Sequence, residues 1–139
     1  MTTKEYLGQA YRIDQRINSK LEQVHSLREL ATKASSILRE GAAIANRNVQ
    51  SMDATIAKII DLEAEINRDI DKLVDTKREI VSVIKRIQNP EYQALLELRY
   101  LCFKSWEQIA VDMSHGIDNI FRMHRRALDV VSALMKIVQ

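Results

Sequence analysis

Glycine, proline and cysteine are scarce in this chain of 139 residues, which contains three Gly, one Pro and one Cys. These glycine and proline residues are too few to form the many tight turns of an all-β or α/β fold. The single cysteine, Cys102, cannot form an intramolecular disulfide. We therefore predict an all-α fold without disulfides.

The sequence also lacks a long apolar run and a basic-then-apolar segment at its N-terminus. Charged residues recur every few positions, so no window approaches the roughly 18 uninterrupted apolar residues of a membrane-spanning helix. Without the pattern of a secretory leader, we expect a cytoplasmic protein that has no membrane partner. The formal net charge of +2 permits a nucleic-acid partner but does not indicate one, so any such inference depends on local patches.

Motifs that indicate catalysis or metal binding are missing as well. No P-loop, glycine-rich phosphate loop, nucleophile elbow or activated cysteine occurs. His115 and His124 have no cysteine or carboxylate at metal-ligand spacing, so we expect no zinc site. A group of acidic residues lacks the histidine spacing of carboxylate-bridged metal bundles and is expected to be solvated: Glu63, Glu65, Asp69, Asp71 and Asp75. We predict a protein that is not an enzyme and holds no cofactor.

Two long heptad patterns precede residue 90. The second has a four-three spacing that only Glu63 and Lys77 interrupt, and it comprises Met52, Ile56, Ile59, Glu63, Ile66, Ile70, Leu73, Lys77, Ile80, Ile84 and Ile87. The first runs from Tyr6 to Leu38. Two such patterns of similar length predict an antiparallel, coiled-coil-like helical hairpin over residues 1–89. Because long seams usually find further partners, we expect this hairpin to self-associate, with a dimer favoured, or to dock a partner.

Polar residues and glycine mark the expected turn of the hairpin. Gly41 and the run Asn46 to Asn48 lie between the two heptad patterns, and Ser51 is a candidate N-cap for the second helix. Asn89 and Pro90 end that helix, because the residue before proline leaves the α region and proline suits the first turn of a new helix. The predicted domain boundary falls there.

Residues 90–139 have the spacing of a trihelical helix-turn-helix domain. After a first apolar helix, Ser105 is placed to cap a short second helix, and Ser114 to Gly116 form a tight connection to a long third helix. Small Ala110 is expected where the last two helices cross. The predicted apolar contacts between those helices are Ile109, Met113, Ile120 and Met123, with Ile117 as an alternative to Ile120.

The exposed start of the third helix is the predicted DNA-binding face, which enters a major groove. Arg122 and Arg125 can donate to guanine edges or phosphates, Asn119 can pair with adenine, and Phe121 can contact a thymine methyl group. The residues better placed for phosphate contacts are Lys104, Ser105 and Arg126. Asp118 shares this face, so binding is expected to be modest and sensitive to salt.

Several short runs in this domain match a known family: LRY at Leu98–Tyr100, SWEQIA at Ser105–Ala110, Met113, and I-F-R-M-H-x-x-A-L at Ile120–Leu128, where x is any residue. With them, the chain resembles the fourth region of bacterial sigma factors and, more closely, the ArpU-like regulators of Gram-positive phages and prophages. The resemblance implies sequence-specific binding to double-stranded DNA and control of phage genes, often late genes, with RNA polymerase as a further partner. The family usually has glycine where this chain has Ser114, and polar or basic residues where it has Ile117 and Asp118.

Two other functions fit the same features. Phage small terminases also join a helix-turn-helix to an oligomerising helical region, so a DNA-packaging recognition subunit is one alternative. A sigma-like module that binds protein and not DNA is the other, because the C-terminal domain is nearly neutral and carries Asp118 on its reading face. An assembly of eight or more chains would favour packaging, whereas a monomer, dimer or tetramer favours regulation.

Overall fold

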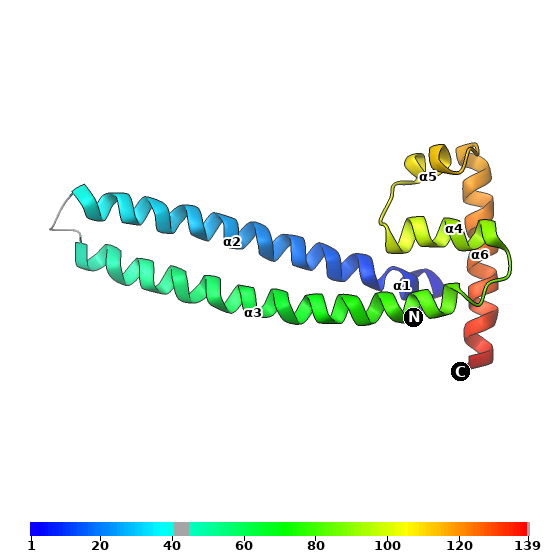
Figure 1. Cartoon of the computed structure of the whole chain (residues 1–139), viewed down its shortest axis with the longest axis horizontal. Helices are drawn as coiled ribbons and strands as arrows, with labels where there is room; N and C mark the ends of the chain where they lie inside the picture. The colour runs from blue at the N-terminus through cyan, green and yellow to red at the C-terminus, as the bar shows by residue number, and fades with distance from the viewer. Residues whose placement is uncertain (41–44, 139) are drawn as a thin grey trace. The chain divides into compact units, whose positions relative to one another are not determined.

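The computed structural model describes residues 1–40 and 45–138, and its secondary structure over that range is entirely helical, as predicted. In chain order the elements are α1 (Thr3–Leu7), α2 (Gln9–Glu40), α3 (Ala45–Ile84), α4 (Pro90–Leu96), the π-helical turn η1 (Glu97–Leu101), α5 (Trp106–Asp112) and α6 (Ile117–Val138) (Figure 1). Gly41, which was expected in the turn, lies outside the described residues. The side chain of Leu38 lies outside them too.

The chain divides into two compact units. The first unit comprises residues 1–13 and 73–139, and the second comprises residues 14–72. The first unit crosses the predicted boundary at residues 89 and 90, because Leu7 and Ala10 are buried in one cluster with Ile80, Ile84 and Val131. The N-terminal helix therefore belongs to the same compact body as α4, α5 and α6.

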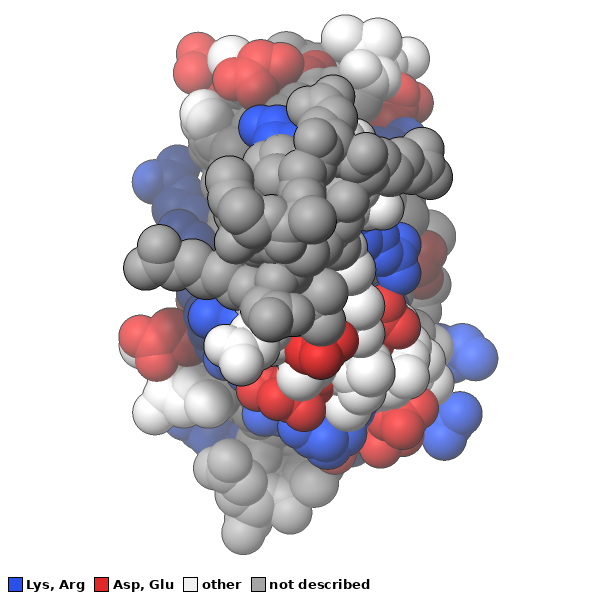
Figure 2. Space-filling view, turned by 90° about the vertical axis from the view of Figure 1, so that its left-hand side faces the viewer, with Lys and Arg blue, Asp and Glu red and all other residues white. Residues whose placement is uncertain are grey.

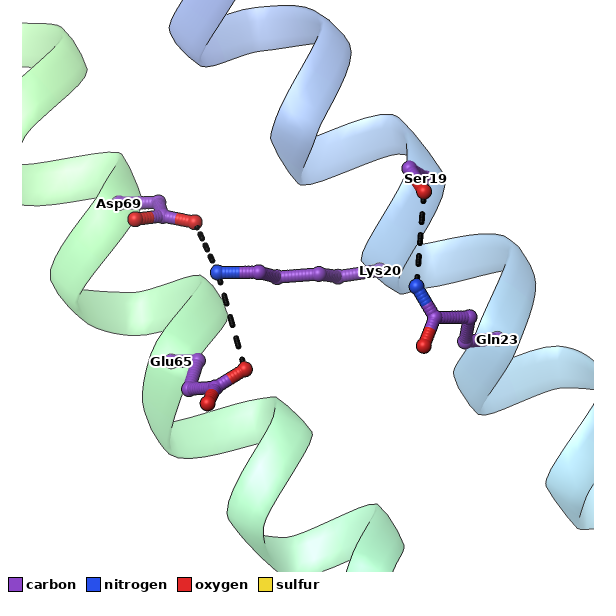
Figure 3. Close-up of polar contacts among 5 residues, drawn as sticks. All are labelled: Ser19, Lys20, Gln23, Glu65 and Asp69. Atoms are coloured by element: carbon purple, nitrogen blue, oxygen red, sulfur yellow. Dashed lines mark hydrogen bonds and ion pairs between the residues drawn. The ribbon is translucent and has the colours of Figure 1, made fainter.

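In the second unit, α2 and α3 pack along one apolar face and are linked by ion pairs. The buried residues of this face are Ile17, Val24, Ile59, Leu62 and Ile66. The ammonium of Lys20 on α2 lies 2.7 Å from a carboxylate oxygen of Asp69 on α3 and 3.7 Å from one of Glu65 (Figure 3). Glu63, an interruption of the predicted seam, pairs with Arg28 at 2.7 Å. The Arg28–Glu63 pair is exposed and adds little stability, whereas Lys20 and Asp69 are partly buried; both pairs favour one register of the two helices.

The face of α3 that packs on α2 is rotated from the predicted heptad seam. Leu62, which flanks the seam, is buried, whereas the seam residues Ile56 and Ile70 are 43% and 42% exposed. Ile60 is 61% exposed. Because α3 has apolar residues over a wide arc and α2 covers only part of it, an apolar stripe of Ile56, Ile60 and Ile70 remains on the surface.

The predicted start of the second long helix was wrong. Helix α3 begins at Ala45, so the run Asn46 to Asn48 is helical and Ser51 lies inside the helix instead of capping it. The carbonyl oxygen of Ser51 accepts a hydrogen bond from the Thr55 hydroxyl at 2.8 Å. Asn and Ser disfavour helix by less than about 1 kcal/mol each, which is too little to end a helix that packs along much of its length.

The end of α3 also differs from the prediction, because the helix stops at Ile84 and not at Asn89. The carbonyl oxygen of Ile84 accepts a hydrogen bond from the amide of Ile87 at 3.0 Å, and the side-chain amide of Gln93 donates to the carbonyl oxygens of Ile84 at 3.2 Å and Ile87 at 2.8 Å. These bonds serve carbonyls at and just beyond the helix end. The predicted start of the next helix is confirmed. Asn89 caps α4, where its side-chain oxygen accepts two backbone N–H bonds of 2.9 and 3.3 Å, and Pro90 occupies the first turn.

A π-helical turn, absent from the prediction, follows α4. The amide of Cys102 donates to the carbonyl oxygen of Glu97 at 3.0 Å, five residues back. Phe103 then adopts a φ of 60°, a left-handed conformation that is unusual for a bulky residue. Its ring is held in place by the edge of Tyr11, at 5.6 Å between centroids, and by the ammonium of Lys77, 4.7 Å from the ring centre.

Helices α5 and α6 are joined by the predicted tight connection. The amide of Ser114 donates to the carbonyl of Val111 at 3.2 Å, and that of His115 donates to Ala110 at 3.0 Å. These two bonds, with Ser114 at a φ of 57°, form a Schellman motif whose left-handed position is usually glycine.

Helix α6 contributes to two buried clusters of the first unit. Ile120 and Met123 pack with Leu95 of α4 and Ile109 of α5. The remainder of its buried stripe packs in a second cluster, which comprises Leu7, Ala10, Ile80, Ile84, Ile87, Leu96, Tyr100, Ala127 and Val131. Ile120 and not Ile117 faces inward, since Ile117 is 36% exposed. These contacts fix which face of α6 is turned outward.

Replacing Ser114 with glycine should stabilise the protein. A left-handed conformation costs a residue with a side chain roughly 1 kcal/mol, and glycine avoids that cost. We expect Ser114→Gly to raise the free energy of unfolding by about 0.5–1 kcal/mol in urea titrations. Ser114→Ala is the matched control and should give no such gain. A glycine variant that is no more stable than the alanine variant would contradict the strain assigned to this turn.

Candidate nucleic-acid interface

Helix α5 is short, and its first turn is fixed by Ser105. The hydroxyl oxygen of Ser105 accepts a hydrogen bond from the amide of Gln108 at 3.2 Å, which confirms the predicted N-cap. Ile109 is fully buried in the cluster that contains Ile120 of α6. The start of α5 therefore lies at a defined position beside the first half of α6.

The first half of α6 turns a polar face outward. Apart from Ile117, its exposed residues are Asp118, Asn119, Phe121, Arg122, Arg125 and Arg126. At 3.6 residues per turn these positions lie opposite the buried residues Ile120, Met123 and Ala127. None of the three arginines takes part in an ion pair within residues 1–40 and 45–138. Of the predicted site residues, this face brings together five.

Two of these side chains already have partners within the protein. The side-chain amide nitrogen of Asn119 lies 2.8 Å from Nδ1 of His115, in the turn before the helix. Phe121 is 41% exposed and makes a T-shaped contact with Trp106, with ring centroids 5.5 Å apart. Phe121 therefore has one side against the protein and the other available to a ligand.

Lys104 is engaged in an ion pair, which weakens its predicted role in phosphate contact. Its ammonium donates to the carboxylate of Asp112 at 2.7 Å, and the side-chain amide of Gln108 donates to the same carboxylate at 2.7 Å. The hydrogen bond from Lys104 lowers the pKa of Asp112, and the same bond raises the pKa of Lys104. Ser105 remains exposed beside this pair.

A buried hydrogen bond behind the α6 face was not anticipated. The phenol of Tyr100, in the π-helical turn, lies 2.6 Å from Nε2 of His124. Burial lowers the pKa of His124 to about 4, with smaller contributions from the positive charges of Lys4 and Arg99. Burial also raises the pKa of Tyr100 to about 12. Both groups are therefore neutral near pH 7, and the bond satisfies two polar atoms inside an apolar cluster.

Trp106 links this buried pair to the surface. The ring centres of Trp106 and His124 are 4.5 Å apart. The guanidinium of Arg99 lies 4.4 Å from the ring centre of Trp106. Trp106 is partly buried and also packs against the cluster of Leu95 and Ile109. No site role was predicted for Arg99. Its stacking on Trp106 depends on the π-helical turn, and that turn has no clear signal in the sequence.

The arrangement of charge distinguishes the α6 face from other parts of the surface. On the face drawn in Figure 2, basic and acidic side chains are interspersed among the coloured residues. The α6 face instead carries three arginines, Arg122, Arg125 and Arg126, and one acidic residue, Asp118. An excess of cations on one exposed helix suits an anionic polymer.

Features of other ligand classes are absent from the described part of the chain. No group of three or more His, Cys, Asp or Glu residues there is arranged to hold a metal ion. Within residues 1–40 and 45–138, no helix is both long enough and apolar enough to cross a membrane.

His124 should make the stability of the protein depend on pH. Its pKa is about 4 in the folded chain and 6.5 as the ordinary value, so the unfolded chain binds the proton first as pH falls. The contribution of neutral His124 to stability is thus fully present above pH 6.5 and is lost progressively as the pH falls to about 4. At roughly pH 5 the free energy of unfolding has fallen by about 2 kcal/mol for this reason.

Urea unfolding near pH 7 and near pH 5 measures this loss. The control is His124→Gln, which does not titrate but keeps a hydrogen-bonding group for Tyr100. We expect the free energy of unfolding to fall further between the two pH values in the wild type than in the variant. Equal falls in the two proteins would show that His124 is not buried in its neutral form.

Comparison with known proteins gives one match. No curated protein and no solved structure matches the chain. The model of one family, described as a protein of unknown function (DUF1492), matches residues 40–132, which run from the end of α2 into the second half of α6. This match covers more than half of the chain, including every residue of the candidate interface. The chain therefore belongs to the DUF1492 family.

Proposed function

We propose that this protein is a sequence-specific regulator of transcription that binds double-stranded DNA and controls phage or prophage genes. In this proposal α4, α5 and α6 form a helix-turn-helix domain similar to the fourth region of sigma factors. Helix α6 enters the major groove, and α5 lies across the backbone of the duplex. The hairpin of α2 and α3 brings two copies together.

The observation that carries the proposal is the two-faced character of α6. One side of the helix is buried in two clusters, while the opposite side presents Arg122, Arg125 and Arg126 without any ion pair among the described residues. These three exposed arginines on one side of the helix make no ion pair that would stabilise the described part of the fold. They do suit guanine edges and phosphates, which arginine binds through two parallel hydrogen bonds.

The polar contacts of the site fit a division of roles. Arg122 and Arg125, in the first half of α6, contact the bases. Phe121 provides an apolar surface next to them, beside Trp106. Ser105 and Arg126 contact phosphates on either side of the groove. Asp118 opposes the phosphates, so a single domain binds weakly, and two linked domains bind more tightly because the second contact becomes intramolecular.

The partner that supplies the second domain is another copy of the same chain. The apolar stripe of Ile56, Ile60 and Ile70 lies on one side of α3 and is left uncovered by α2. Two such stripes are alike, so they can pack against each other in the manner of a coiled coil. Exposed apolar stripes of this kind commonly mark an interface.

Loss of Arg122 and Arg125 should weaken specific binding. Binding sites are first selected from host genomic fragments with the wild-type chain, and affinity is then measured on an enriched site. Each guanine contact contributes roughly 1–3 kcal/mol, so we expect Arg122→Ala with Arg125→Ala to weaken binding by about 30-fold or more. The control is Lys85→Ala with Arg86→Ala, which removes equal charge from two exposed residues just after α3. Unchanged affinity in the Arg122 and Arg125 variant would contradict the site.

The stripe on α3 should determine the number of chains in the assembly. We expect the wild type to have a mass of about 32 kDa by light scattering, twice the 16.0 kDa of one chain. Ile56→Glu with Ile60→Glu should give monomers, because the dimer would bury the new charges. The matched control is Ala54→Glu with Ala57→Glu, two exposed alanines outside the stripe on the same stretch of helix.

The same measurement separates the proposed function from its closest alternative. A wild-type assembly of eight or more chains would favour a DNA-packaging subunit over a regulator. A dimer that persists in the Ile56 and Ile60 variant would mean that another surface joins the chains.

A further inference from the structure

A cleft of about 550 Å³ lies within the first unit, between its N-terminal helices and the segment that leads into α5. Lys4 and Glu5 of α1, Arg12 of α2, and Arg99, Phe103 and Ser105 are among its lining residues. The cleft therefore joins parts of the chain that are far apart in the sequence. Neither the sequence patterns nor the family match assigns it a role.

The charge of the cleft is predominantly positive. It has three cationic side chains, Lys4, Arg12 and Arg99, and one carboxylate, that of Glu5. The carboxylate of Glu5 accepts a hydrogen bond from the amide of Thr2 at 3.2 Å as part of the capping box of α1. The described residues provide no ion pair for any of the three cations. An anion entering the cleft would find positive charges that no carboxylate has neutralised.

The two guanidinium groups are held in position by neutral partners. Arg12 donates to the backbone carbonyl of Glu5 at 2.9 Å, and Arg99 donates to the backbone carbonyl of Lys104 at 2.9 Å while it lies over Trp106. Carbonyl oxygens and an indole ring fix the geometry of a guanidinium without cancelling its charge. Such preordered donors suit a phosphate group, which accepts several hydrogen bonds at once.

The cleft lies close to the proposed DNA-reading face. Trp106 contacts Arg99 of the cleft at 4.4 Å, and it contacts Phe121 of the α6 face through rings 5.5 Å apart. Trp106 therefore contacts both a residue of the cleft and a residue of the α6 face. The positive charges of Lys4 and Arg99 also contribute to the lowered pKa of His124 on α6, so their field reaches that helix.

We infer that this cleft binds a backbone phosphate of the DNA strand that borders the groove entered by α6. The N-terminal helix α1 then belongs to the DNA interface, and Lys4, Arg12 and Arg99 extend the phosphate contacts predicted for Ser105. This inference depends on the proposed function, because the phosphate is that of a duplex. It adds an element that lies outside residues 40–132 to the binding surface.

The dependence of binding on salt tests the inference. Fluorescence anisotropy gives the affinity of the full chain for a mixed-sequence duplex of about 30 base pairs, at potassium chloride concentrations of roughly 50 to 200 mM. Each phosphate contact contributes about 0.9 to the slope of log affinity against log salt. Lys4→Ala with Arg12→Ala should reduce that slope by roughly 1 to 2, with at least a several-fold loss of affinity at the lowest salt.

Two controls keep the result interpretable. Lys85→Ala with Arg86→Ala removes the same charge from exposed residues of the same unit and should leave the slope unchanged. Lys4→Ala alone tests the site without loss of the bond from Arg12, and it should lower the slope by about 0.9. Equal slopes for the wild type and both Lys4 variants would overturn the inference. If the wild type shows no salt-dependent binding, the proposed function itself is wrong.

Discussion

The buried stripe of α6 is the contact on which the first unit depends. Ile120 and Met123 join one cluster, with α4 and α5, while Ala127 and Val131 join a second cluster that includes α1 and the end of α3. Two separate clusters on one side of a helix prevent it from rotating about its axis. The side that carries Arg122 is consequently held outward by the same contacts that stabilise the fold.

Local signals in the sequence were sufficient to predict much of this unit. The helix start at Asn89 and Pro90, the cap at Ser105 and the connection at Ser114 each depend on residues within a few positions of one another, and all three are found in the structure. The spacing of apolar residues likewise predicted that Ile120 could face inward. The outward position of the predicted DNA-binding residues on α6 follows from the same period.

What the sequence could not predict depends on contacts between distant segments. Gln93, nine residues after the end of α3, donates to the carbonyls of Ile84 and Ile87, and no local pattern of α3 itself encodes that end. The π-helical turn brings Tyr100 to His124, a pairing across 24 positions of the chain. The stripe around Ile60 is apolar in the sequence whether or not α2 covers it, so its exposure could not be read from periodicity. The position of Lys4 near His124 of α6 likewise depends on contacts between distant segments of the chain.

The central claim is that the outward face of α6 binds duplex DNA. Nuclear magnetic resonance of the nitrogen-15-labelled full chain tests it directly, with a duplex of about 30 base pairs added at low salt. The largest changes in amide resonances should occur at Asn119, Arg122 and Arg125, while Ile56 and Ile60 of α3 stay unchanged. Spectra that do not respond to DNA, or whose changes concentrate on α3, would contradict the claim.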